Sequence, residues 1–266
     1  MTRLASTNGS DVHDPANPAT APRRPGLAAT RSIRGASSTA GIAIVLTALL
    51  APFGALFAVQ GRVTEGNAAR TAASIIEHEG LFRLGIVSLL LVIALDVLVA
   101  WALYRVFSPV SQGISMLAAV LRFVYSGVFL VAISELLGVL RLLGNDDYLA
   151  VFSADQLHAQ ALLGISAFND VWQAGLFLFG LHLLVVGYLA YKSGYVPRFI
   201  GVLVAIAGLG YAFDSLAAVF SKGSLPAVSS VTFVGEFVLA LWLMIRGSRL
   251  VLTESRLGDD PITGAR

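Results

Sequence analysis

Six ionisable side chains lie inside long apolar stretches of the sequence, and their types could support chemistry. They are four acids, one arginine and one histidine: Asp96, Arg122, Glu135, His182, Asp214 and Glu236. A charge at the centre of a bilayer costs at least about 2.5 to 3.5 kcal/mol, so each needs a partner, an interfacial position or a function. Opposite charges at one depth indicate an ion pair, whereas grouped acids are typical of a proton or cation relay.

Asp96 and Arg122 are expected to pair with each other. The loop between their two apolar stretches is centred near Val110, fourteen residues after Asp96 and twelve before Arg122. At 1.5 Å per residue both side chains lie roughly 20 Å from the loop, on adjacent antiparallel helices. The spacing predicts a buried ion pair that fixes the register of the two helices. The alternative is a pair that gates a pathway or anchors a substrate.

The other four residues form a predicted polar site in the outer half of the membrane: Glu135, His182, Asp214 and Glu236. Thirteen residues separate Arg122 from Glu135, which puts them on nearly opposite faces of one helix. These acids therefore need other partners, each other, protons or a cation. The alternative is that each acid is neutral and hydrogen-bonded within the fold. A lone histidine such as His182 is more typical of packing than of metal binding.

The sequence contains none of the common catalytic signatures. It has no cysteine, which excludes disulfide scaffolds and thiolate chemistry. It has no HExxH helix, GxSxG turn or Walker loop. A formal net charge of +2, with its basic residues mostly at segment ends, gives little support to nucleic-acid binding. We therefore expect no catalytic residue, no metal, no cofactor and no enzymatic activity.

The elements that position these residues are apolar helices. Hydrophobic residues make up 56% of the chain and charged residues 13%, against about 25% charged in soluble domains. A membrane-spanning helix needs roughly 20 apolar residues. We predict an all-α, polytopic membrane protein, a six-transmembrane-helix bundle whose partner is the lipid bilayer. The predicted spans are residues 36–59, 81–107, 113–140, 171–191, 199–220 and 230–245.

Segments outside the spans are expected to be short or unfolded. Residues 1–34 are predicted to be a disordered basic tail and residues 248–266 a second tail, flanking a membrane domain over residues 35–247. With the N-terminus inside, twelve of the 18 lysines and arginines lie on the inner side and five on the outer side. This distribution favours cytoplasmic termini. Residues 66–80 suit an interfacial helix, and Ser153 with Gln156 predicts the capped start of a short amphipathic helix.

Two further patterns concern helix packing. Gly201, Ala205 and Gly208 recur along the fifth span, and such small residues predict a close helix contact or, alternatively, a homodimer interface. A tight turn at the cytoplasmic interface is predicted before this span. Gly194 would make its bend and Pro197 would start the next helix; the turn comprises Lys192, Ser193, Gly194, Pro197 and Arg198.

Several segments resemble one family. The segment FGLHLLVVGYLAYKSGYVPRFIGVLVAIAGLGYAFDSL, residues 179–216, resembles the bacterial integral membrane family called domain of unknown function 4386. Similar matches are HEGLFRLGI from His78, DVLVAWALYRVFSPV from Asp96, LAAVLRFVY from Leu117 and GEFVLALWLMIRG from Gly235. The resemblance covers about residues 35–247. It implies a six-helix protein of the bacterial cell membrane and supplies no activity, but it places six polar residues on family motifs: Asp96, Arg122, His182, Arg198, Asp214 and Glu236.

Two functions remain open from the sequence. The first is a structural, sensory or partner-binding membrane protein without turnover. The second is a small transporter or channel for a cation or proton that uses the intramembrane carboxylates. The chemical class of any small-molecule or ion ligand is not indicated.

Overall fold

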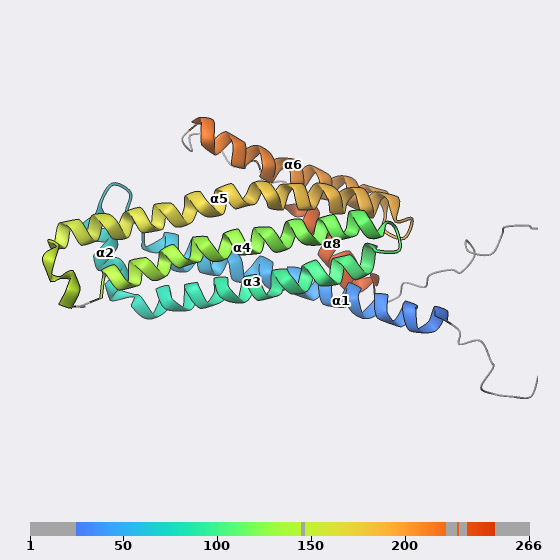
Figure 1. The fold of residues 1–266 in the computed structure, drawn as a ribbon, viewed down its shortest axis with the longest axis horizontal. Coiled ribbons are helices and arrows are strands. Elements are labelled where there is room, and N and C mark those ends of the chain that lie inside the picture. The colour runs from blue at the N-terminus through green and yellow to red at the C-terminus, as the bar shows by residue number, and fades with distance from the viewer. Residues whose placement is uncertain (1–24, 145–146, 222–227, 229–232, 248–266) are drawn as a thin grey trace, which may run out of the picture.

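A computed structural model describes residues 25–144, 147–221, 228 and 233–247, and within these ranges the chain forms helices and no strand. The long helices run side by side in one elongated bundle (Figure 1). Its α-helices are α1 (Pro25–Pro52), α2 (Ala68–Glu77), α3 (Glu79–Phe107), α4 (Gln112–Leu142), α5 (Ala154–Lys192), α6 (Arg198–Ser221) and α8 (Val234–Ile245). A π-helical stretch, Phe53–Val59, continues α1, and two short 3₁₀ helices cover Gln60–Arg62 and Asp147–Val151.

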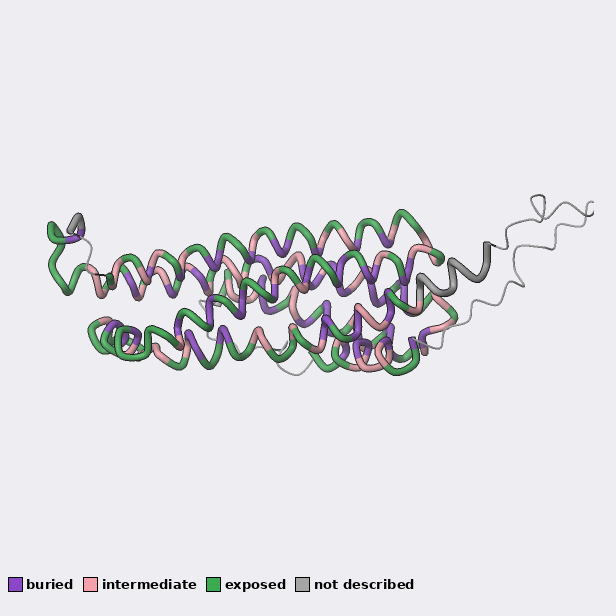
Figure 2. The backbone as a smooth tube through the Cα atoms, turned by 90° about the horizontal axis from the view of Figure 1, so that it is seen from below, coloured by how far each residue is buried: buried purple, intermediate pink, exposed green. Residues whose placement is uncertain are grey.

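The surface of the bundle is apolar and its interior holds polar groups. Large apolar side chains such as Leu84, Trp101, Phe123 and Leu209 are more than half exposed, whereas Asp96, Arg122 and His182 are buried. Figure 2 shows buried positions turned toward the neighbouring helices and exposed positions turned outward along the length of the bundle. An exposed apolar surface of this extent is what lipid contact requires. Five helices are long and apolar enough to cross a membrane.

The sixth predicted span is shorter in the structure. The sequence predicts residues 230–245, of which 230–232 lie outside the described residues, and α8 has only 12 residues. Twelve residues rise about 18 Å, well short of the roughly 30 Å of a bilayer core. Within the described residues, α8 begins at Val234 and ends at Ile245, directly before Arg246. The fold is thus a helical bundle with five long apolar helices and one half-length helix.

The fourth predicted span and the amphipathic segment before it form one helix. Ser153 caps α5 as expected, because its side chain accepts from the Gln156 backbone while the Gln156 side chain accepts from the Ser153 backbone. Gly164 lies within this stretch but does not end the helix, and α5 runs on for 39 residues without a proline. The prediction of a separate short helix ending before residue 171 was therefore wrong.

The ends of the predicted membrane domain also differ from expectation. Helix α1 begins at Pro25, inside the tail predicted over residues 1–34, where proline suits the first turn of a helix. The rest of that tail, residues 1–24, and the tail at 248–266 lie outside the described residues. Helix α2 occupies the predicted interfacial segment, but Ala72 and Ile75 are buried, because α2 packs against α5.

Helices α5 and α6 pack closely through a seam of small residues. Gly180 faces Gly208, and Gly187 faces Gly201, so that a side chain at any of the four would meet backbone of the opposite helix at 2.6 to 2.8 Å. Ala205 lies against Gly187 in the same seam. The predicted stripe of Gly201, Ala205 and Gly208 is therefore a packing face within the chain. Its small residues already have α5 as their neighbour, which does not support their use as a dimer interface.

The turn between α5 and α6 has the geometry expected from its residues. Gly194 adopts a φ of +74°, which other residues rarely adopt. The Ser193 hydroxyl donates to the Ala190 carbonyl at 2.7 Å and accepts from the Val196 backbone at 3.1 Å. Lys192 ends α5 and Arg198 begins α6, directly after Pro197. The Tyr195 hydroxyl donates to the Val106 carbonyl at 2.6 Å, and burial raises the pKa of this phenol.

Candidate functional site, a charged cluster beside an internal cavity

Asp96 on α3 and Arg122 on α4 form the ion pair that their distances from the connecting loop predict. Both Nε and Nη2 of Arg122 donate to Oδ1 of Asp96, at 3.1 and 2.6 Å. The Arg122 side chain is 1% exposed and the Asp96 side chain is 2% exposed. Because the loop between α3 and α4 is short, the helices are antiparallel neighbours and the two residues meet at one depth.

A second acid reaches the same guanidinium. Nη1 of Arg122 donates to Oε1 of Glu236 at 3.2 Å, and the Glu236 side chain is 15% exposed. Gly235 positions this acid, since a side chain there would meet the Leu203 backbone, and its absence lets the first turn of α8 lie directly on α6. An acid in the first turn of a helix also faces the positive end of the helix dipole.

His182 contributes an acceptor to the cluster. Its Nδ1 lies 2.8 Å from the Ala118 carbonyl, which can only accept, so Nδ1 carries the proton and donates. In the neutral ring Nε2 is then an acceptor, and Arg122 Nη1 lies 3.3 Å from it. The histidine on α5 thus holds Arg122 and Ala118, two residues one turn apart on α4. This role is positional, and within the described residues no group of acids and histidines suits a metal ion.

The cluster contains more negative than positive charge. Asp96 and Glu236 face a single cation, Arg122, while His182 is neutral in the arrangement described above. The cluster carries one excess negative charge when both acids are ionised, and it is neutral when one of them holds a proton. Within the described residues, Oδ2 of Asp96 and Oε2 of Glu236 accept no hydrogen bond. Two carboxylate oxygens therefore remain for a proton or an external donor.

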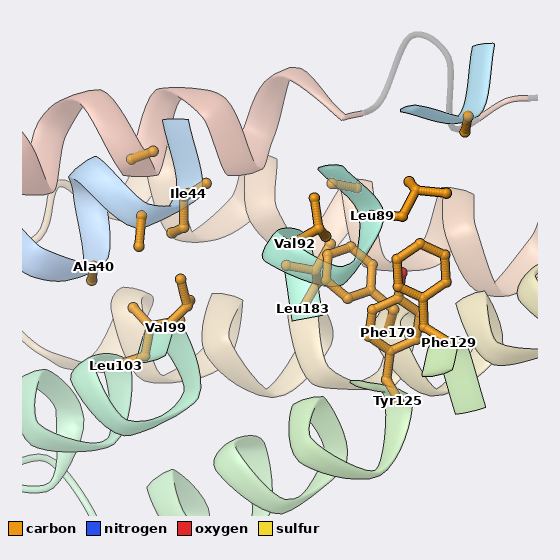
Figure 3. Close-up of a cluster of buried hydrophobic side chains, with 14 of the residues drawn as sticks. Ala40, Ile44, Leu89, Val92, Val99, Leu103, Tyr125, Phe129, Phe179 and Leu183 are labelled. Atoms are coloured by element: carbon orange, nitrogen blue, oxygen red, sulfur yellow. The ribbon is translucent and has the colours of Figure 1, made fainter. Parts of the chain in front are cut away.

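A cavity of about 530 Å³ lies beside the cluster. All six long or half-length helices contribute to its wall, and pockets for small molecules in proteins span about 300 to 1,000 Å³. Asp96, Arg122 and Glu236 form its charged end. The rest of the wall is apolar and rich in aromatic rings, namely Tyr125, Phe129, Trp172, Phe179, Tyr211, Phe233 and Phe237. Figure 3 shows Tyr125, Phe129 and Phe179 gathered near Leu89 and Val92.

The aromatic rings form a connected group. The ring centroids of Tyr125 and Phe179 are 5.0 Å apart, and Phe179 meets Tyr211 edge-on at 5.2 Å. Arg122 itself lies over Phe179 at 5.2 Å, which extends the contact from the rings to the charges. The Trp172 indole donates to the Tyr125 hydroxyl at 3.1 Å, so that this hydroxyl retains its own proton for a further acceptor.

One polar group on the cavity wall has no partner in the described structure. The Thr47 hydroxyl on α1 is buried from solvent and makes no hydrogen bond. A buried hydroxyl without a partner costs about 1 to 3 kcal/mol, so this position favours a partner that the chain itself does not supply. Thr47 lies five residues before Pro52, which has no N–H to donate to the Ala48 carbonyl and precedes the π-helical stretch.

Part of the cavity wall lies at the start of α8. Helix α8 packs on α1 through Gly41, which faces Ala240 and Met244, but α8 begins only at Val234. The part of α1 that extends past the level of Val234 has no described residue of α8 beside it. The cavity wall here includes Leu56 and Phe233, which are 63% and 44% exposed. These two side chains are therefore exposed parts of the cavity wall.

Glu135 and Asp214 do not join this cluster. The Glu135 carbonyl faces Gly164, which precedes His182 on α5 by eighteen residues, about 27 Å of helix. Asp214 accepts from the Val228 backbone at 2.9 Å. The hydroxyls of Ser134 and Ser215 bind backbone carbonyls, of Val131 and Gln173, instead of the acids. Of the four residues predicted to form one site, the structure brings Glu236 and His182 to Arg122 and places Glu135 farther along the bundle.

Sequence reasoning missed the uncharged part of the site. Tyr125 follows Arg122 by three residues and Phe179 precedes His182 by three, spacings that place each pair on one helix face. These spacings could have identified both rings. Thr47 and Trp172 have no such signal, because their distance to the cluster depends on how α1 and α5 are arranged in space.

Comparison with known proteins identifies the family of this chain. Residues 39–247 match the family described as "Domain of unknown function (DUF4386)". The chain belongs to this family. An uncharacterized protein of Archaeoglobus fulgidus is 37% identical over 165 residues, covering 62% of this chain and 85% of the relative. No solved structure matches the chain. The matched region contains the four residues of the cluster and the helices that form the cavity wall.

Proposed function

We propose that this protein is an integral membrane protein that binds a small amphipathic molecule inside its helix bundle, without chemical turnover. The observation that carries the proposal is the cavity of about 530 Å³, which has one charged end, an aromatic wall and an unpartnered Thr47 hydroxyl. A protein whose only task was to pack in the membrane would gain stability by filling this space. The cavity therefore supports a sensory or carrier role over a purely structural one.

The proposed site is reached from the bilayer. The cavity wall at Leu56 and Phe233 lies among exposed apolar side chains, so an amphipathic molecule dissolved in the lipid would meet it directly. We further propose that the chain spans a cell membrane with both termini in the cytoplasm. The excess of basic residues on that side supports this orientation.

The proposal is tested by filling the cavity. Ala51 lies on the wall, and Ala51→Phe would occupy part of the space that a ligand needs. The measurement is the melting temperature of the purified protein in detergent against a panel of lipids and small amphipathic molecules, because a ligand stabilises only the state it binds. We expect at least one compound to raise the melting temperature of the wild type and to have no effect on Ala51→Phe.

A matched control separates occupancy of the cavity from a general effect of a new ring. Leu209→Phe adds an aromatic ring at an exposed position of α6, away from the cavity wall. It should retain the ligand response of the wild type. A response that is equal in wild type, Leu209→Phe and Ala51→Phe would show that the compounds act outside the cavity, and would overturn the proposal.

A second candidate function is the carriage of a proton or cation. The observation that favours it is the presence of two carboxylates, Asp96 and Glu236, around the single charge of Arg122. One excess acid in an apolar environment is stabilised by taking up a positive charge. Flux of protons or cations into liposomes that contain wild type, and its loss in a folded Glu236→Gln variant, would support this function. Equal flux in both would exclude Glu236 as the carrier.

A further inference from the structure

We infer that the molecule bound in this cavity is a lipophilic organic cation, whose charge is held by Glu236 and Asp96 and whose apolar body lies against the aromatic wall. The inference rests on the proposed function and names the ligand class for the same site. Three features of the described residues carry it: the charge balance of the cluster, the hydrogen bonds that Arg122 already makes, and the aromatic lining of the cavity.

The charge balance favours a cation. Two carboxylates share one guanidinium, and Oε2 of Glu236 and Oδ2 of Asp96 accept no hydrogen bond from a described residue. Both acids line the cavity. A monocation placed between them would complete the neutralisation of the cluster and would use the acceptors that Arg122 leaves free.

The arginine cannot serve as an anion site in this arrangement. A guanidinium has five N–H groups, and Arg122 directs four contacts to Asp96, Glu236 and His182. Arg122 also lines the cavity, but most of its N–H groups are already directed at these three side chains. An anionic ligand would meet the free carboxylate oxygens and be repelled by them. The cavity therefore discriminates by charge sign.

The lining of the cavity favours an organic cation rather than a metal ion as the ligand. The described residues offer no group of three ligands that suits a metal. The ring centroids of Tyr211 and Phe179 are 5.2 Å apart, and those of Phe179 and Tyr125 are 5.0 Å apart. All three rings line the cavity together with the charged side chains. Aromatic faces attract alkylammonium and phosphonium groups, which have dispersed charge and weakly bound water. The Thr47 hydroxyl, on α1, offers an additional polar contact on the cavity wall.

The inference is tested with two probe ions of equal shape and opposite charge. Tetraphenylphosphonium and tetraphenylborate differ in the sign of their charge and little in size or apolar surface. Saturable binding of each to the purified wild-type protein in detergent is measured by equilibrium dialysis. We expect the phosphonium to bind and the borate to neither bind nor compete. Borate binding at equal or higher affinity would overturn the inference.

Variants then locate the charge that selects the cation. Glu236→Gln removes the excess negative charge, and we expect the Kd of tetraphenylphosphonium to rise about tenfold or more. Glu135→Gln removes a half-buried carboxylate of α4 that does not line the cavity, and its Kd should equal that of the wild type. An unchanged Kd in Glu236→Gln would overturn the role of this acid. If Glu236→Gln is not monodisperse, the comparison of the two ions on the wild type still decides the inference.

The same experiment separates failure of the inference from failure of the proposed function. If both ions bind equally and Ala51→Phe blocks both, the cavity is a binding site that does not select charge, so the inference fails and the proposed function stands. If neither ion binds the folded wild type, or if Ala51→Phe leaves phosphonium binding unchanged, the result counts against both.

Discussion

The seam between α5 and α6 and the cluster around Arg122 are both interior regions that involve α5, yet they are built on opposite principles. In the seam, glycines allow the two backbones to touch and no cavity-lining polar group takes part. In the cluster, charged side chains from α3, α4 and α8 and the neutral His182 of α5 meet beside the cavity of about 530 Å³. Substitution of a seam residue displaces backbone, whereas substitution in the cluster displaces side chains and ligand.

This difference indicates a division of tasks within the bundle. Close backbone packing fixes α6 to α5, and through Gly235 it fixes the start of α8 to α6. Glu236 is thereby placed next to Arg122 by contacts that are remote from the charges. The cluster is thus positioned by this packing as well as by its own ion pair, and it lines the cavity.

The largest effect is expected in the seam. A Cβ atom added at Gly187 would lie only 2.7 Å from the Gly201 carbonyl oxygen. The larger side chain of Gly187→Leu must therefore push α6 away. We expect a loss of about 4 kcal/mol or more in unfolding free energy, or failure to purify a folded protein. Thermal unfolding in detergent measures the change. Gly127→Leu, at a helix position of α4 with open space around it, is the control and should melt near the wild type.

The next effect concerns the two acids of the cluster, which are not equivalent. Asp96 accepts two hydrogen bonds from Arg122 and is buried, so Asp96→Asn should cost about 3 kcal/mol, as breaking a buried pair does. Glu236 accepts one longer bond and is partly exposed, so Glu236→Gln should cost about 1 kcal/mol. Melting temperatures of the two variants give the comparison. A reversed order would mean that Glu236 is the structural acid of the cluster.

A smaller effect is expected at the aromatic wall. Trp172→Phe keeps a ring beside Phe129 but removes the indole donor to the Tyr125 hydroxyl. Hydrogen bonds between membrane helices are worth about 0.6 kcal/mol on average, and we expect a loss of that size. The same thermal assay applies, with Trp101→Phe as the control at an exposed position of α3. A loss as large as that of Asp96→Asn would contradict the assignment of stability to the charged pair.

The smallest effect on stability is expected at Thr47. Thr47→Val removes a hydroxyl that has no partner and keeps the shape of the side chain, so stability should be unchanged or increase by up to about 1 kcal/mol. Binding of an amphipathic cation should nevertheless weaken, because the variant lacks the polar contact that the cavity offers. Equal binding by Thr47→Val and the wild type would show that the hydroxyl does not face the ligand.

The sequence predicted those features that depend on local geometry. The depth of Asp96 relative to Arg122 follows from a short loop and a fixed helical rise, and the bend at Gly194 follows from its conformational freedom. The place of Glu236 did not follow, because it depends on where α8 begins and on how Gly235 packs against α6. Likewise, hydropathy identified the apolar run of α8 but did not show that its helix is half-length.

The unbroken course of α5 has a mechanical consequence. His182 touches the charged cluster, and the Ala154 end of the same helix lies twenty-eight residues away, about 42 Å of continuous helix. A tilt of about 5° at the cluster would therefore displace the far end by roughly 4 Å, and α2, which packs on α5, would be carried with it. The unbroken helix thus connects the charged cluster mechanically with α2, through α4 and α6 as well as α5 wherever these pack together.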